Sequence, residues 1–153
     1  MSLGIYFRDS AGAMSLVTNG SDSSNPVTTI HDGKNGDTIS VVLYLRNDNI
    51  TKWYSNITIV PVDLVDTDPY GDVIYTETGW GVKVNKGGDE PTDAEWGDVD
   101  WGDDANMDDV GSNVAGDSTT YFPFWYLISC PPNENAQNKS DIVLQVNHTE
   151  NAV

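Results

Sequence analysis

The residues best suited to chemistry in this chain are carboxylates. The stretch DTDPYGDVIYTE carries them at spacings close to those of a calcium-binding loop, with glycine at the sixth position. Its candidate metal ligands are Asp66, Asp68, Asp72 and Glu77. Tyr70 stands where a fifth-position ligand would be and Pro69 interrupts the loop, so the pattern is not that of an EF-hand. These carboxylates are candidates for a calcium site of another kind, and ordinary turn chemistry is the alternative.

A second group of carboxylates follows in a glycine-rich stretch. Such a group could chelate a cation, but a solvated acidic loop is the alternative. Its members are Asp98, Asp100, Asp103, Asp104, Asp108 and Asp109.

The residues for acid-base or nucleophilic catalysis are few. His31 and His148 are the only histidines, no GxSxG motif occurs, and Cys130 lies inside an apolar run. Carboxylate pairs are too abundant here to indicate acid-base chemistry. The sequence therefore predicts no enzyme and no cofactor, and an enzyme would need a cleft that brings His31 or His148 beside carboxylates.

Five tryptophans suggest a different class of site, because exposed rings on a β-sandwich can hold sugars. Core or loop packing is the alternative, since aromatic side chains bury a large area. We favour packing for Trp80 and Trp125 and leave both functions open for Trp96 and Trp101. A carbohydrate-binding module would require Trp96 and Trp101 to be exposed to solvent.

The charge balance limits the partners. The formal net charge is -17, from 24 Asp plus Glu against 7 Lys plus Arg in 153 residues. Such a surface repels phosphate backbones and anionic lipids, so neither nucleic acid nor a membrane is an expected partner. Solubility, cation binding or a high-salt habitat fits the acidity better.

Cellular location can be inferred from the apolar segments. The start of the chain lacks an apolar stretch of signal-peptide length, and no segment is long enough to span a bilayer. We therefore expect synthesis in a cytoplasm. Cys130 is the only cysteine, so no intrachain disulfide forms, and a small buried hydrophobic side chain is expected there.

Apolar residues recur with the period of two that is typical of strands. In DTISVVLYLRND, Ile39, Val41, Leu43 and Leu45 share one face. Similar runs occur in LGIYFRD, AMSLVTN, PVTTIHDG, YSNITIVPVDL, GVKVNK and DIVLQVNHTE, where Pro61 suggests an edge or a bulge. Residues 1–153 are predicted to form one all-β domain, an immunoglobulin-like β-sandwich, with a small β-barrel as the alternative.

One segment interrupts this pattern, from about 87 to 118. It is acidic and rich in glycine, so we expect an excursion on the surface rather than a part of the core. Within it, only PTDAEW resembles a helical turn, with Pro91 and Asp93 as possible first residues. If the segment is an excursion, deletion of residues 98–109 should leave the fold intact.

The run YFPFWYLISCPP is the densest aromatic segment. Alternation puts Phe122, Phe124, Tyr126 and Ile128 on one face, and Tyr121, Trp125 and Leu127 on the other. Apolar residues on both faces indicate a central strand, covered on one side by the opposite sheet and on the other by the long loop or a partner subunit. Trp80, Trp96, Phe124 and Trp125 are therefore candidates for the core or for an interface.

Residues 79–132 resemble a known family. The order GWGVKVNKGGDEPTDAEW, a Gly-Asp-rich loop and YFPFWYLISCPPNENAQ is similar to that in small structural proteins of tailed double-stranded DNA viruses, bacteriophages or archaeal viruses. The resemblance implies a virion protein, in the first place a capsid decoration (cement) protein that binds the major capsid protein or other virion proteins as a homo-oligomer. A neck, tail or baseplate protein, or a receptor-recognition module, is the alternative. The acidic loop and Cys130 depart from the family pattern, and the family brings no catalytic residues.

Overall fold

The structure is a computed structural model. It describes residues 3–18, 28–47, 49–63, 80–107, 114–115, 121–132, 138–139 and 142–152. The elements in chain order are β1 (Leu3–Arg8), β2 (Met14–Thr18), β3 (Thr29–Ile30), β4 (Asp37–Asn47), β5 (Lys52–Asp63), β6 (Gly81–Lys86), α1 (Asp93–Gly97), β7 (Ala105–Asn106), β8 (Val114–Ala115), β9 (Phe122–Cys130), β10 (Asn138–Lys139) and β11 (Ile142–Ala152).

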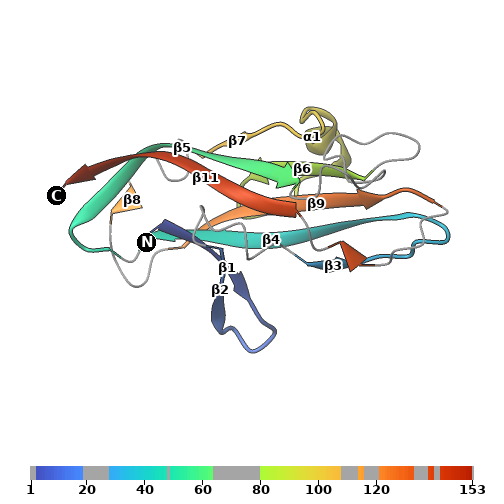
Figure 1. Ribbon diagram of the computed structural model, residues 1–153, viewed down its shortest axis with the longest axis horizontal. Helices are drawn as coiled ribbons and strands as arrows, with labels where there is room; N and C mark the ends of the chain where they lie inside the picture. Colours follow the sequence, from blue (N-terminus) through green and yellow to red (C-terminus); the bar gives the residue numbers. More distant parts are fainter. Residues whose placement is uncertain are drawn as a thin grey trace.

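The strands form two antiparallel sheets that pack as a sandwich (Figure 1). One sheet has the order β2-β1-β4-β9-β6, and the other has the order β11-β5-β7 with β8 also pairing with β5. The strands β3 and β10 form a separate pair. The predicted immunoglobulin-like sandwich is therefore confirmed, whereas the alternative of a closed barrel is wrong for the described residues. Within those residues, no helix is apolar and long enough to cross a membrane.

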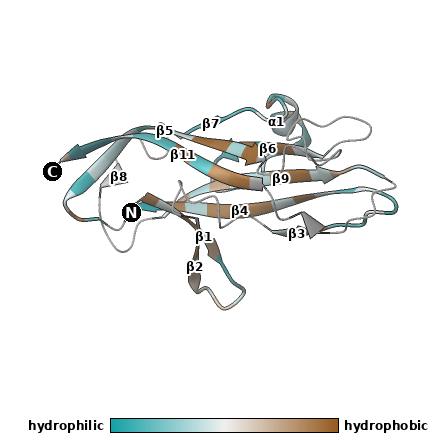
Figure 2. Ribbon diagram, viewed as in Figure 1, coloured by the Kyte–Doolittle hydropathy of each residue, from teal (hydrophilic) through white to brown (hydrophobic). Residues whose placement is uncertain are grey.

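The core lies between the two sheets and follows the alternation expected from the sequence. The brown segments of β4, β6, β9 and β11 in Figure 2 mark these apolar residues. The buried side chains that line it include Leu43, Leu45, Ile57, Ile59, Trp80, Val82, Val84, Phe124, Tyr126, Ile128, Leu144 and Val146. Ile39, Val41 and Phe122 pack against this cluster while partly exposed. Burial of these apolar faces is what holds the two sheets together.

The bulge expected near Pro61 lies elsewhere. Pro61 keeps its register opposite Leu144, and the register shifts between Asn147 and Thr149, beside Asn56. Asn56 has a φ of 51°, a left-handed conformation that asparagine tolerates better than most residues. On the side of β5 that faces away from β11, no strand in the described part of the chain pairs with Pro61. The N–H that proline lacks would point to that side, so no hydrogen bond between strands is lost.

Residues 87–118 are only partly the surface excursion that we expected. Their described part contains α1, β7 and β8, and Ala105 and Met107 belong to the core cluster. The backbone N–H of Met107 donates to the Ile57 carbonyl at 2.8 Å. The expectation was wrong for residues 105–107. Alternate side chains of an extended chain point the same way, so the two apolar side chains on either side of Asn106 both point into the core.

Candidate functional site

The outer face of the five-stranded sheet carries the most distinctive surface residues. The strand register places one row of residues directly opposite one another across β2, β1, β4 and β9: Leu16, Tyr6, Tyr44 and Pro123. Since Leu43 and Leu45 point into the core, their neighbours Tyr44 and Arg46 point outward. The row therefore belongs to the face that lies away from the second sheet.

Two arginines lie over the tyrosines of this face. The Arg8 guanidinium is 4.6 Å from the Tyr44 ring centroid, and the Arg46 guanidinium is 5.5 Å from that of Tyr6. Arg46 is also 5.2 Å from the Tyr121 ring and donates from Nη1 to the Tyr121 hydroxyl at 2.9 Å. We call these five residues the Arg-Tyr patch. Cation-π contacts hold the two positive charges in place on an otherwise acidic protein.

The tyrosines also order one another. Tyr121 meets Tyr6 edge to face with a centroid distance of 5.9 Å, and it meets Tyr44 in the same way at 6.3 Å. Such T-shaped pairs place the positive ring edge against the negative ring face. The patch is thus a preformed surface, because its side chains already constrain each other.

The other half of this face is covered by residues 88–101. Lys83 points outward between the buried Val82 and Val84, and its Nζ donates to the Trp96 carbonyl at 2.8 Å. At the middle of the face, Trp125 Nε1 donates to the Gly88 carbonyl at 3.4 Å, and Ser40 donates to the Glu90 carboxylate. These contacts explain how residues 88–101 are held on the sheet.

The helix α1 begins with a capping box. The Thr92 hydroxyl accepts from the Glu95 N–H at 3.3 Å, and the Glu95 carboxylate accepts from the Thr92 N–H at 2.8 Å. The hydrogen bonds from the Thr92 backbone and hydroxyl lower the pKa of Glu95. This carboxylate therefore stays ionised and adds to the negative charge around the helix.

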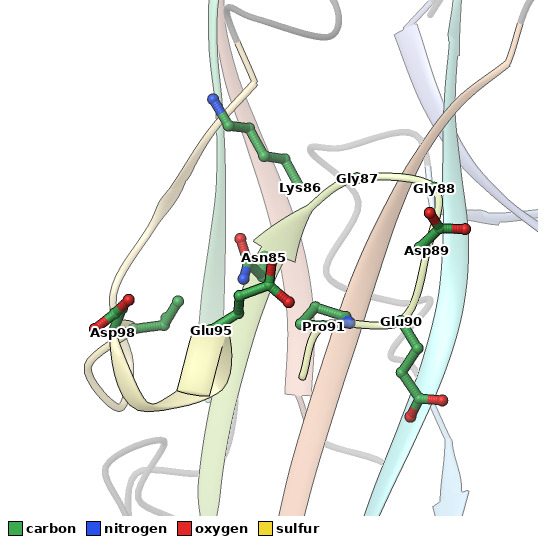
Figure 3. Close-up of a pocket in the computed structure, with 10 residues that line it drawn as sticks. Asn85, Lys86, Gly87, Gly88, Asp89, Glu90, Pro91, Glu95 and Asp98 are labelled. Carbon is green, nitrogen blue, oxygen red and sulfur yellow. The ribbon is translucent and has the colours of Figure 1, made fainter. Parts of the chain in front are cut away.

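A groove of about 480 Å³ opens between α1 and the turn after β6. Four carboxylates line it, from Asp89, Glu90, Glu95 and Asp98. Figure 3 shows that they come both from the chain before α1 and from α1 and its end. With Asp93 on the same helix, we call these five residues the acidic segment. Within the described part of the chain, no group of three His, Cys, Asp or Glu residues is arranged to hold a metal ion.

The predicted calcium ligands Asp66, Asp68, Asp72 and Glu77 all lie outside the described residues. The same holds for Asp108 and Asp109 of the second carboxylate group. The remaining members of that group, Asp98, Asp100, Asp103 and Asp104, have exposed side chains. The calcium site stays a prediction.

The tryptophans differ in their surroundings. Trp80 is buried in the core, and Trp96 is 7% exposed. Trp101 lies under the Lys83 ammonium, which is 4.5 Å from its ring centroid, and Trp125 is half-buried. Packing is thus confirmed for Trp80, whereas Trp125 is only half-buried, on the outer face of the sheet. Trp96 therefore lacks the exposure that a sugar site would require.

His31 is buried with a hydrogen-bond partner on each ring nitrogen. Its Nδ1 is 2.6 Å from Asp37 Oδ1, and its Nε2 is 2.6 Å from the Thr29 hydroxyl. The ring meets Trp80 edge to face at 4.9 Å. An ionised Asp37 carboxylate accepts from Nδ1–H, and in a neutral ring Nε2 then accepts from the Thr29 hydroxyl. The structure thus brings one of the two histidines beside a carboxylate.

The same three side chains have the order of a Thr-His-Asp hydrolase triad. Thr29 also borders an apolar groove of about 400 Å³, but it is only 6% exposed. The side chain of His31 is completely buried, so a substrate reaches neither residue without local opening. We interpret the cluster as a bridge that ties β3 to the start of β4.

A glycine turn places Asp37 for this bridge. The Gly36 N–H donates to the Asp32 carbonyl at 2.8 Å, and Gly36 has a φ of 77°. A Cβ at this position would meet the Cys130 carbonyl at 2.9 Å, so both the conformation and the space require glycine. Asp37 Oδ2 then accepts from the Asp32 N–H at 2.9 Å.

Replacement of Asp37 with Ala is expected to lower the free energy of unfolding by about 1–3 kcal/mol. The change leaves the buried His31 Nδ1 and the Asp32 N–H without their acceptor. Urea denaturation monitored by tryptophan fluorescence measures the loss. Asp103→Ala removes the same charge from an exposed position and serves as the control. Equal stability of the two variants would show that the bridge does not hold β3 and β4 together.

His148 lies on the other sheet and makes a different contact. Its ring meets Tyr54 edge to face at 4.8 Å, and the Tyr54 hydroxyl donates to Glu150 at 3.3 Å. Glu150 also pairs with Lys52 at 2.8 Å, and the hydrogen bond from Lys52 lowers the pKa of Glu150. These groups lie on neighbouring strands β5 and β11 and are far in sequence from His31.

Sequence reasoning missed the Arg-Tyr patch. The alternation in β4 already placed Tyr44 and Arg46 opposite to the core residues, which was the available signal. It could not show that Tyr6, Arg8 and Tyr121 would join them, because strand order alone brings β1 and the start of β9 beside β4. A scan against protein-family models gives no match for this chain, and a search of curated proteins finds no similar sequence.

Proposed function

We propose that this protein is a non-enzymatic structural component of the virion of a tailed double-stranded DNA virus. Its proposed place is the outer shell, where it decorates the major capsid protein. The observation that carries this proposal is that the separate blocks of the family-like pattern meet in space. The Gly-Trp strand is β6, the Pro-Thr turn begins α1, and the Pro-Phe-Trp strand is β9.

These blocks form one continuous part of the sandwich. The strand β6 pairs with β9 along its whole length, from Gly81 opposite Ser129 to Lys86 opposite Phe124. The Lys83 side chain joins β6 to α1 through the Trp96 carbonyl. The described blocks of the pattern are therefore neighbours in one sheet and on its face, as is expected when a shared fold is the origin of the resemblance.

The surface chemistry also supports the proposal. A decoration protein performs no chemistry and must stay soluble while it occupies many equivalent sites. The net charge of -17 favours solubility and repels a packaged anionic genome. A neck, tail or baseplate protein remains the second candidate, because the same small sandwich suits those positions.

Co-sedimentation with capsids that lack the protein tests the proposal. We expect saturable binding, and imaging of the particles should show the protein at regular lattice positions. Capsids that already carry the protein are the matched control and should bind little more. If the empty positions stay empty at saturating protein, the protein does not decorate the shell, and isolated necks and tails become the next binding targets.

A further inference from the structure

The outer face of the five-stranded sheet is divided into two halves of opposite charge. The Arg-Tyr patch occupies β1, β4 and the start of β9, and the acidic segment lies over β6 and β9. Figure 1 shows the β1-β2 hairpin and α1 at opposite edges of the molecule. We propose that this face is a self-association surface on which the Arg-Tyr patch of one copy binds the acidic segment of a second copy. This inference goes beyond the proposed function and does not depend on a viral shell.

The patch is positive and has no carboxylate of its own. The outward-facing described residues of β1, β2 and the second half of β4 are Gly4, Tyr6, Arg8, Met14, Leu16, Val42, Tyr44 and Arg46. Asp9 is the nearest acid in sequence, and its Oδ1 accepts from the Ala11 and Ala13 N–H groups of the hairpin turn. Two of the 7 cationic side chains thus lie together among described outward-facing residues that include no acid.

The side chains of the patch suit a protein partner that presents carboxylates. Tyrosine and arginine are enriched among the residues that dominate binding energy at interfaces. A guanidinium has five N–H donors and matches a carboxylate in a two-pronged geometry. Arg8 is exposed, so a partner can reach its guanidinium, and Arg46 is held in place by its hydrogen bond to the Tyr121 hydroxyl. The exposed Leu16 adds an apolar contact at the edge of the patch.

The acidic segment of a second copy offers the complementary chemistry. The side chains of Asp89, Asp93 and Asp98 are exposed. Asp89 lies in the turn after β6, Asp93 begins α1, and Asp98 caps its end. The helix is tied to the sheet by the hydrogen bond from Lys83 to the Trp96 carbonyl. A two-fold axis in the plane of this face, between the two halves, brings each patch against the partner's acidic segment. Such an isologous arrangement forms both contacts at once and closes as a dimer.

The high net charge affects the conditions for this contact. Two copies of charge -17 repel each other at low ionic strength. At about 0.15 M salt the Debye length is about 8 Å, so distant charges are screened while direct contacts persist. Salt weakens the attraction between half-buried charges less than the repulsion between distant exposed charges. The association should therefore be measured near this ionic strength.

Sedimentation velocity with charge-swapped variants of the whole chain tests the proposal. The first variant, Arg8→Glu with Arg46→Glu, reverses the charge of the patch. The second, Asp89→Lys with Asp93→Lys and Asp98→Lys, reverses the charge of the acidic segment at its three exposed aspartates. We expect the natural chain to dimerise at a protein concentration of about 100 µM, and each variant alone to associate at least about tenfold more weakly. An equimolar mixture of the two variants should recover the dimer, because every contact in the mixed dimer again joins opposite charges.

Matched controls separate the contact from net charge and from misfolding. Lys34→Glu with Lys52→Glu changes the net charge as much as the patch variant but lies elsewhere, and it should dimerise like the natural chain. Arg8→Glu alone changes an exposed side chain and keeps the Arg46 contacts, so it tests the patch if the double variant fails to fold.

Three outcomes would overturn the inference. The natural chain could stay monomeric up to about 1 mM, which is too weak for a specific dimer. The patch variants could dimerise as well as the natural chain, or the mixture could fail to recover what both variants lose. None of these outcomes bears on shell binding, so the two proposals fail separately.

Discussion

Replacement of Phe124 with Ala is expected to lower the free energy of unfolding by about 3–5 kcal/mol. Phe124 is completely buried in the central strand β9, opposite Leu43 of β4 and Lys86 of β6. Truncation removes a large aromatic contact and leaves a cavity between two rigid sheets, which cannot collapse to fill it. Urea denaturation monitored by circular dichroism measures the loss.

Trp125→Ala is the matched control for this prediction. Trp125 is the next residue of the same strand, but it points to the outer face and is half-buried. From the sequence we expected both residues to behave as core, whereas the structure restricts full burial to Phe124. A Phe124→Ala loss below about 1 kcal/mol would contradict the placement of this side chain in the core. A larger loss for Trp125→Ala would mean that the outer face contributes more than the core.

Replacement of Met107 with Ala is expected to lower the free energy of unfolding by about 2–5 kcal/mol. Met107 is completely buried in the core cluster, and its N–H donates to Ile57 of β5. The loss arises from the cavity, because the substitution keeps the backbone hydrogen bond. The effect would be measured by the same denaturation experiment.

Asp104→Ala is the control for Met107, since Asp104 is exposed and lies three residues before it in the chain. We expect this change to leave stability within about 0.5 kcal/mol of the natural chain. Deletion of residues 98–109 should then prevent stable folding, contrary to the expectation from the sequence, because it removes Ala105 and Met107 from the core. A folded deletion variant with unchanged stability would show that the segment is a dispensable excursion after all.

Much of the sandwich could be predicted from the sequence. The alternation of Leu43 with Tyr44, or of Val82 with Lys83, shows which face of a strand is buried, because successive side chains point to opposite sides. The helical turn predicted in PTDAEW is α1, which begins at Asp93, one of the two expected first residues, and is capped by Thr92. These features are local, and local geometry follows from neighbouring residues.

Residues 87–118 show where local reasoning fails. Their composition is polar and indicates a surface loop, yet Ala105 and Met107 turn inward beside β5. A stretch of two apolar residues among aspartates is too short to produce a clear periodic signal. Trp96 was undecided for the same reason, because its burial depends on how the segment folds over β6 and β9.

By itself, the sequence determined the all-β class, the inward faces of the long strands and the strong negative charge. Only the tertiary structure decided which distant residues meet. His31 is bridged between Thr29 and Asp37 over Trp80, and Arg46 lies between Tyr6 and Tyr121. The physical reason is that strand alternation is encoded by adjacent residues, whereas the order of strands in a sheet depends on contacts between residues far apart in the chain.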